Sequence, residues 1–176
     1  MSTVSLRPMT EQDAPRLFSL VDANRETLHK FWWEEKTQSP DDSLAYIMRA
    51  NETEVTDQIP TRGIFVQELL IGVAGLHSID WRKRRAEVGY WIDTDHTGQG
   101  YVQEAVRQLS GVAFGEVGLN ELTICTRVSN QASRSVAERC GFQLTAIDTQ
   151  PSWDEDAPVD VAHYSLFAKQ SEITRQ

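Results

Sequence analysis

The part of this sequence whose composition points most directly to chemistry is a glycine-containing segment at residues 93–105. It reads Asp-Thr-Asp-His-Thr-Gly-Gln-Gly-Tyr-Val-Gln-Glu-Ala, and Gly98 and Gly100 lie between a strand-like run at 86–92 and a helix-like run. The first backbone N–H groups of a helix have no intrahelical partners and carry the positive end of the helix dipole. Glycines let that backbone approach a phosphate closely. The segment therefore predicts an anion cradle suited to a pyrophosphate.

Two other phosphate-binding patterns fail to match these glycines. The P-loop requires a Lys-Ser or Lys-Thr pair after its last glycine, whereas Gly100 is followed by Tyr101 and Val102. The dinucleotide fingerprint requires three glycines, and Gln103 stands where the third would be. A tight turn that contains two glycines remains the alternative to a phosphate site.

Motifs on either side of the glycine loop narrow the interpretation. Before it lies Arg-Ala-Glu-Val-Gly-Tyr-Trp-Ile at 85–92, and after it come Asn-Gln-Ala-Ser at 130–133 and Ala-Glu-Arg-Cys-Gly-Phe at 137–142. In this order and spacing they resemble the GNAT superfamily of acyl-CoA-dependent N-acetyltransferases, and more narrowly the group that acetylates ribosomal-protein N-termini. The resemblance extends over residues 3–167. Asp95 departs from it, because the family usually has Gln or Arg at this position of the loop.

The resemblance implies acetyl-CoA as the cofactor and a path along which it binds. The pantetheine arm would pair with the strand before the glycine loop, as an added strand does, and the pyrophosphate would lie on loop N–H groups. Asn130 and Ser133 would lie near the thiol end, with Ser133 as a proton donor to the leaving thiolate. As ordinary structure, Asn130 is a helix N-cap and Ser133 a first-turn residue. The cofactor-binding residues expected are Val88, Tyr90, Trp91, Ile92, Gly98, Gln99, Gly100, Tyr101, Val102, Asn130 and Ser133.

The reaction implied is direct attack of a neutral amine on a thioester, which needs a base to take up the amine's proton. Glu87 is the leading candidate, because it lies among apolar residues in the strand before the glycine loop. Its structural alternative is an ion pair with Arg84 or Arg85. His77, two positions after Gly75, is the second candidate, and its alternative is a histidine packed within the sheet.

An aromatic and acidic segment at 31–35, Phe-Trp-Trp-Glu-Glu, suggests how an acceptor could be held. Tryptophans beside carboxylates bind cationic groups through cation–π and charge contacts, and the family often has a Trp-rich segment lining the acceptor cleft. We expect Trp32, Trp33 and Glu34 to bind the acceptor, with Trp81 joining the same cleft. A helix that packs its tryptophans into the core is the alternative.

A second acidic feature lies near the C-terminus, in the loop predicted at 151–158. It carries Asp154, Glu155 and Asp156 and contains no lysine or arginine. We therefore expect that these three charges cannot all be neutralised locally and that they attract a cationic acceptor, although plain solubility would explain them equally well.

Composition excludes several other classes of protein. The chain has 176 residues, 40% hydrophobic and 24% charged, which fits a single soluble domain with a sizeable core. The net charge of −9 argues against nucleic-acid binding, which requires a basic surface. No apolar run is long enough for a membrane span and no signal peptide opens the chain, so a cytoplasmic protein is expected. The four histidines lack metal-ligand spacing, and Cys125 and Cys140 are expected to be reduced, packed thiols.

Hydrophobic periodicity predicts the order of the elements. Helix-like runs at 10–21, 27–33 and 39–48 follow an edge strand at 2–8, and a polar loop is expected at 51–62. Strands at 63–67, 70–79 and 85–93, a helix at 100–117 and a strand at 121–128 follow, so 86–128 forms a parallel βαβ unit. A helix at 130–139 and strands at 142–148 and 159–169 complete the pattern. The fold class expected is α/β, a GNAT-like mixed and splayed sheet of six to seven strands flanked by helices, in one domain at 1–170 with a polar tail at 171–176.

The function expected is acetyl transfer from acetyl-CoA to a primary amine, with a protein N-terminal α-amine favoured. A small-molecule amine acetyltransferase, acting on a polyamine or an aminoglycoside, and a non-catalytic acyl-CoA-binding module are the alternatives. The partners expected are acetyl-CoA and an amine acceptor, with neither nucleic acid nor membrane, and a homodimer stays open.

Overall fold

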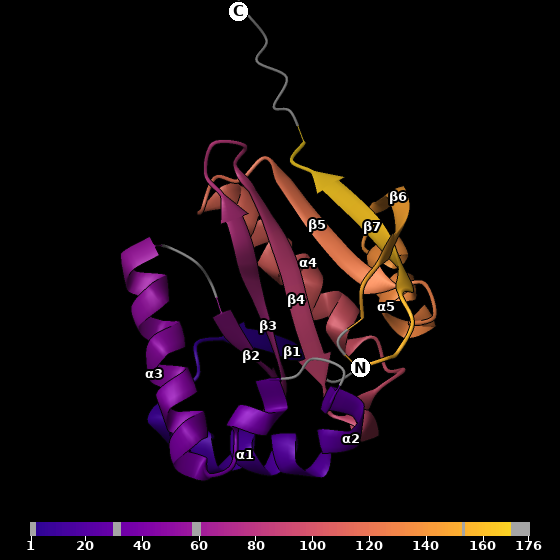
Figure 1. The fold of residues 1–176 in the computed structure, drawn as a ribbon. Helices are drawn as coiled ribbons and strands as arrows, with labels where there is room; N and C mark the ends of the chain where they lie inside the picture. The colour runs from indigo at the N-terminus through magenta and orange to yellow at the C-terminus, as the bar shows by residue number, and fades with distance from the viewer. Residues whose placement is uncertain (1–2, 30–32, 58–60, 153, 170–176) are drawn as a thin grey trace, which may run out of the picture.

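The computed structural model describes residues 3–29, 33–57, 61–152 and 154–169, and only the backbone at 33–34 and 53–57. Within these residues, seven strands form one sheet in the order β1-β2-β3-β4-β5-β7-β6 (Figure 1). The strands are β1 (Val4–Arg7), β2 (Thr61–Val66), β3 (Leu69–Asp80), β4 (Arg85–Ile92), β5 (Glu121–Arg127), β6 (Gln143–Gln150) and β7 (Val159–Phe167). The helices are α1 (Ala14–Ala23), α2 (Arg25–Leu28), α3 (Pro40–Asp57), α4 (Tyr101–Gly115) and α5 (Gln131–Arg139), with short 3₁₀ turns η1 (Glu11–Asp13), η3 (Trp33–Lys36) and η4 (Thr94–His96).

The strand pairing confirms the mixed sheet and the βαβ unit. Neighbouring strands are antiparallel throughout except for β4 and β5, which are parallel and joined by α4. A parallel pair needs a crossover connection, and α4 supplies it. In Figure 1, β4 and β5 begin side by side and diverge toward their carboxyl ends, with α4 behind them.

Two apolar clusters cover the two faces of the sheet. The larger one packs α4 and α5 against the sheet through residues such as Val106, Leu109, Leu122 and Tyr164. The smaller one packs α1 and α3 against β2 and β3. Because successive strand residues point to opposite faces, Val88 and Ile124 belong to the larger cluster, and their strand neighbours face the other way.

One helix expectation is wrong, and another can be compared with the structure only in part. The polar run at 51–57 was expected in a loop, but α3 continues through it to Asp57. It contains neither glycine nor proline, and Asn51 holds the helix by donating from Nδ2 to the Met9 carbonyl oxygen, 3.0 Å away. A polar surface helix of this kind has no apolar stripe for periodicity to detect. The short helix expected at 27–33 overlaps α2 (Arg25–Leu28) at residues 27–28, and residues 30–32 lie outside the described part of the chain.

The described residues form neither a membrane-spanning helix nor a cluster of metal ligands. Of the helices formed by the described residues, none combines the length and apolarity needed to cross a bilayer. Within the same ranges, no group of three or more His, Cys, Asp or Glu side chains is placed to hold a metal ion. The polar tail expected at 171–176 lies outside the described residues.

Candidate active site

The glycine loop has the backbone geometry of an anion cradle. Gly98 has a φ of 74° and Gly100 a φ of 82°, a region that residues with a Cβ adopt only under strain. Gly100 is the N-cap of α4 and provides no side chain to occupy the N–H groups that follow it. A Cβ built at either glycine would meet no atom within 4 Å. The N-terminal end of α4 is therefore open, with its unpaired N–H groups available to an anion.

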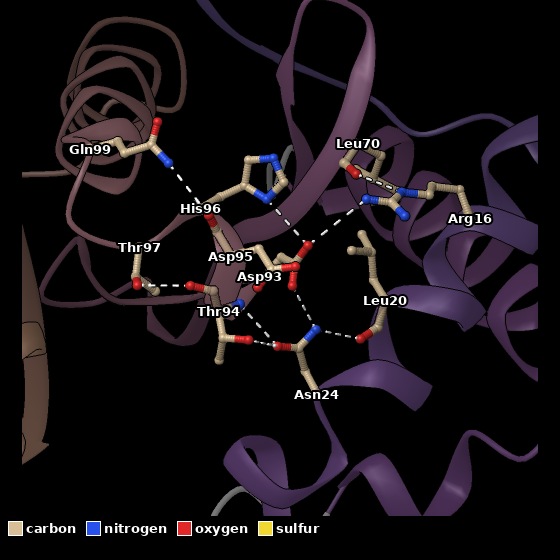
Figure 2. A network of polar contacts seen from close by, with 10 residues as sticks. All are labelled: Arg16, Leu20, Asn24, Leu70, Asp93, Thr94, Asp95, His96, Thr97 and Gln99. Carbon is tan, nitrogen blue, oxygen red and sulfur yellow. Dashed lines mark hydrogen bonds and ion pairs between the residues drawn. The ribbon is translucent and has the colours of Figure 1, made fainter.

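A buried polar network holds the start of this loop against the N-terminal helices (Figure 2). Asn24, which follows α1 and is 3% exposed, donates from Nδ2 to Asp93 Oδ1 (3.0 Å) and to the Leu20 carbonyl oxygen (2.9 Å). Its Oδ1 accepts from the backbone N–H and the hydroxyl of Thr94, at 2.9 and 3.0 Å. One side chain thus joins the end of α1 to the turn that leads into the glycines.

Asp93 is the charged centre of the network. Its Oδ2 lies 3.2 Å from His96 Nδ1 and 3.9 Å from an Arg16 guanidinium nitrogen. Burial alone would raise the pKa of Asp93, but hydrogen bonds from Asn24, the Asp95 backbone and His96 outweigh it and lower that pKa. The carboxylate is therefore ionised near neutral pH. Asn24 holds the Thr94 end of η4, and Asp93 holds its His96 end.

A continuous cleft runs from the glycine loop between the diverging strands. Strands β4 and β5 are paired only at Arg85↔Glu121, Ala86↔Leu122 and Glu87↔Thr123. Beyond these pairs, β3 is the only strand of the described residues that pairs with β4. The cleft has a volume of about 1270 Å³. It is lined by twelve of the residues predicted from the sequence: His77, Glu87, Val88, Tyr90, Trp91, Ile92, Gly98, Gly100, Tyr101, Val102, Asn130 and Ser133.

The first turn of α5 contributes Asn130 and Ser133 to the cleft. Asn130 is the helix N-cap, and its side-chain oxygen accepts from the Ser133 N–H at 3.2 Å. The Ser133 hydroxyl lies 2.9 Å from the Tyr90 hydroxyl of β4. Burial raises the pKa of Tyr90 to about 12, so the phenol keeps its proton and can hold Ser133 in place. Asn130 and Ser133 can therefore start α5 and also line the cofactor cleft.

Glu87 and His77 are cross-strand neighbours on β4 and β3. The alternative in which Glu87 pairs with an arginine is not seen: among the described residues, no ion pair joins it to Arg84 or Arg85. His77 is exposed, with Nδ1 3.1 Å from the Ser78 hydroxyl. Its ring lies over Gly89, where an added Cβ would come within 2.9 Å of Nε2.

The remaining predicted residues fall elsewhere. Gln99 does not line the cleft, and its side chain donates to the Asp95 carbonyl oxygen at 3.4 Å. Trp81 is 51% exposed in the β3–β4 turn and is not among the residues that line the cleft. Trp32 lies outside the described residues, as do the side chains of Trp33 and Glu34.

The acidic loop is neutralised in part by a residue from outside it. Arg127 at the end of β5 pairs with Asp154 and, at 2.6 Å, with Glu155. The hydrogen bonds from Arg127 and then Ser152 lower the pKa of Asp154. The cation comes from a strand 27 residues earlier, so inspection of the loop sequence alone could not reveal it.

Sequence reasoning missed Asn24 and Cys125. Asn24 lies 69 residues before Asp93, and no local motif marks it. Cys125 also lines the cleft. Strand alternation could have placed it on the face of the sheet that Glu87 occupies, because Glu87 pairs with Thr123, two residues earlier.

Comparison with known proteins agrees with this geometry. The acetyltransferase (GNAT) domain family matches residues 3–143. The chain is 31% identical to the YdaF protein of Bacillus subtilis (strain 168) over 171 residues, covering 96% of this chain and 93% of that one. It is 29% identical to the ribosomal-protein-serine acetyltransferase of Escherichia coli (strain K12) over 164 residues, covering 93% and 92%. The solved structure of RimL, a ribosomal L7/L12 alpha-N-protein acetyltransferase in complex with coenzyme A, superposes with a TM-score of 0.88 at 25% identity over 97% of each chain.

The chain therefore belongs to the GNAT acetyltransferase family and is an acetyl-CoA-dependent N-acetyltransferase. The residues present fit the cofactor, because the open N-terminus of α4 suits its pyrophosphate, and the edge of β4 beyond Glu87, which no described strand pairs with on the β5 side, suits its pantetheine amides. Asp95, at the position where the family has Gln or Arg, is exposed and is not among the residues that line the cleft.

Proposed function

We propose that this enzyme acetylates the α-amine of a protein N-terminus by direct attack on the acetyl-CoA thioester. The observation that carries the proposal is the position of Glu87, a cleft-lining carboxylate at the last residue pair before β4 and β5 separate. An acceptor entering from the face opposite α4 and α5 would meet this carboxylate beside the thioester.

The acceptor class follows from proton chemistry. An α-amine has an ordinary pKa of about 7.7–8.0 and a lysine amine one of about 10.4, so the α-amine is far more often neutral near pH 7.5. A carboxylate or imidazole such as Glu87 or His77 takes up a proton more readily from the more acidic α-ammonium than from a lysine ammonium. General-base catalysis of this kind typically contributes about 10²–10⁴-fold in rate.

The other groups have roles that follow from their positions. Backbone N–H groups of Gly98 to Val102 bind the pyrophosphate, and the β4 residues Val88 to Ile92 align the pantetheine arm. Ser133, held by Tyr90, donates a proton to the departing thiolate. Positioning of the amine against the thioester contributes up to about 7–11 kcal/mol in favourable systems.

Relatives support both a protein and a polyamine acceptor. The ribosomal-protein-serine acetyltransferase and RimL favour a protein N-terminus. A spermidine N(1)-acetyltransferase of Vibrio cholerae is 24% identical over 143 residues, and the net charge of −9 also suits a polycation. Polyamine acetylation is therefore the second candidate.

The test measures thiol release from acetyl-CoA with three acceptors at equal concentration. They are a peptide with a free N-terminal serine or alanine, the same peptide with a blocked N-terminus and one lysine, and spermidine. The proposal predicts kcat/KM at least about 100-fold higher for the free N-terminus, a difference of about 2.7 kcal/mol. A preference for spermidine or for the blocked peptide would contradict it. Glu121→Gln, which removes a strand carboxylate that lies outside the cleft lining, is the control for Glu87→Gln.

A further inference from the structure

We propose that Cys125, His163 and Asp148 form a proton relay that carries the acceptor's proton from Glu87 to solvent. This inference rests on the proposed function, in which Glu87 takes up that proton. It assigns a role to three side chains that neither the glycine loop nor the α5 motif involves.

The four side chains come from four adjacent strands and share one face of the sheet. Glu87 pairs with Thr123 across β4 and β5, so Cys125 is its diagonal neighbour two residues on. Cys125 pairs with His163 across β5 and β7, and its Sγ lies 3.3 Å from His163 Nδ1. His163 Nε2 lies 2.9 Å from Asp148 Oδ1 on β6. Two contacts thus join Cys125, His163 and Asp148 in a row, and the row begins beside Glu87, whose carboxylate is near enough to raise the pKa of the Cys125 thiol.

The row leads from the cleft to the surface. Glu87 and Cys125 line the cleft. The His163 side chain is 28% exposed and that of Asp148 is 55% exposed. The other face of these strands is closed by the core, in which Ile124 and Tyr164 are buried. The row therefore offers a proton a side-chain route away from the thioester.

The protonation states of Asp148 and Cys125 suit a proton relay better than they suit Cys125 as a nucleophile. The hydrogen bond from His163 lowers the pKa of Asp148, so this carboxylate is ionised and accepts the Nε2–H. His163 Nδ1 is then free to accept from the thiol. Burial, and next the neighbouring Glu87 carboxylate, raise the pKa of Cys125 to about 12, against a weaker opposing effect of Arg85. Since the thiolate is the nucleophilic form, a thiol that keeps its proton is suited to donate and accept hydrogen bonds.

The proton balance of the step is complete. The amine nitrogen bonds the acetyl carbon, the carbon–sulfur bond breaks, and the amine's proton passes to Glu87. Glu87 gives a proton to Cys125 Sγ while the Cys125 S–H proton moves to His163 Nδ1. Glu87 is again a carboxylate, Cys125 again a thiol, and His163 is an imidazolium paired with Asp148. That proton exchanges with solvent, and the proton that Ser133 gives to the thiolate is replaced from solvent.

The experiment measures kcat and both KM values for Cys125→Ala, Cys125→Ser and His163→Gln with acetyl-CoA and the free N-terminal peptide. Cys125→Ala and His163→Gln should each lower kcat about tenfold and leave KM for acetyl-CoA within about twofold. Cys125→Ser keeps a hydroxyl that can donate and accept, so it should recover kcat to within about threefold of wild type. The double variant should be no slower than the slower single one, because both interrupt one path. Cys140→Ala, at the other half-buried thiol and outside the cleft lining, is the matched control.

Three results would overturn the relay while leaving acetyl transfer intact. They are full kcat in Cys125→Ala, a Cys125→Ser variant as slow as Cys125→Ala, and an S-acetyl group on Cys125 after acid quench, which would make it a nucleophile. A wild-type protein that releases no thiol with any amine would instead overturn the proposed function, and the relay with it.

Discussion

Replacement of Asn24 by alanine should loosen the glycine loop without touching the cofactor. The change removes four hydrogen bonds, two of them to Thr94 and one to the Asp93 carboxylate. A buried polar group left without its partner costs about 1–3 kcal/mol. Two such groups, Asp93 Oδ1 and the Thr94 N–H, lead to an expected loss of about 3 kcal/mol in the free energy of unfolding. At about 2–4 °C per kcal/mol for a chain of this size, the melting temperature should fall by about 6–12 °C.

The CoA affinity of Asn24→Ala shows whether Asn24 positions the glycine loop or only stabilises the fold. Calorimetry at a temperature where Asn24→Ala is folded should show at least tenfold weaker CoA binding, or about 1.4 kcal/mol. Ser19→Ala is the control and should change neither quantity, because Ser19 lies on the exposed side of α1 and its hydroxyl bonds, among the described residues, only the Pro15 carbonyl oxygen. An Asn24→Ala protein with wild-type melting temperature and CoA affinity would refute the view that this network holds the loop.

Further predictions concern CoA binding at the glycine loop, Glu87 as the base, stability at acidic pH and the acidic loop at 154–156. Gly100→Val should weaken CoA binding tenfold or more by calorimetry while the fold survives, whereas Gly111→Ala, mid-helix with open space for a Cβ, should bind normally. Glu87→Gln should lower kcat about 10²-fold, move the acidic limb of the pH–rate profile and leave KM for acetyl-CoA unchanged; equal losses of stability and activity would contradict its role as base. Because the folded pKa of Asp93 lies below the ordinary 3.8, its stabilisation is present above that pH and is lost as pH falls through the folded pKa, so Asp93→Asn should flatten the acid end of a stability–pH curve. Arg127→Ala should expose the charges of the acidic loop and steepen the rise of peptide KM with ionic strength, and a KM that ignores salt in both proteins would make these carboxylates plain surface.

The local parts of the site could be predicted from the sequence. Gly98 and Gly100 between a strand and a helix indicate the cradle, because positive φ and unpaired helix N–H groups are consequences of a few neighbouring residues. The parallel pairing of β4 and β5 follows equally from the strand–helix–strand order.

Contacts between distant segments could not be predicted in this way. Asn24 meets Asp93 only because α1 packs beside the end of β4, and Arg127 meets Asp154 only because the β6–β7 loop returns to β5. Alternation indicates that Cys125 and Glu87 share a face, but the partner His163 depends on the register of β7. The polar end of α3 shows the opposite error, since the lack of an apolar stripe hid a helix.

The most direct test of the proposed function is to identify the nitrogen that becomes acetylated. A peptide that carries both a free N-terminal serine and an internal lysine is incubated with acetyl-CoA and the enzyme at pH 7.5, and tandem mass spectrometry locates the acetyl group. The account predicts acetylation of the α-amine, at least about 100-fold faster than of the lysine amine and strongly reduced in Glu87→Gln. Preferential acetylation of the lysine, or an α-amine product that forms as fast in Glu87→Gln as in wild type, would contradict it.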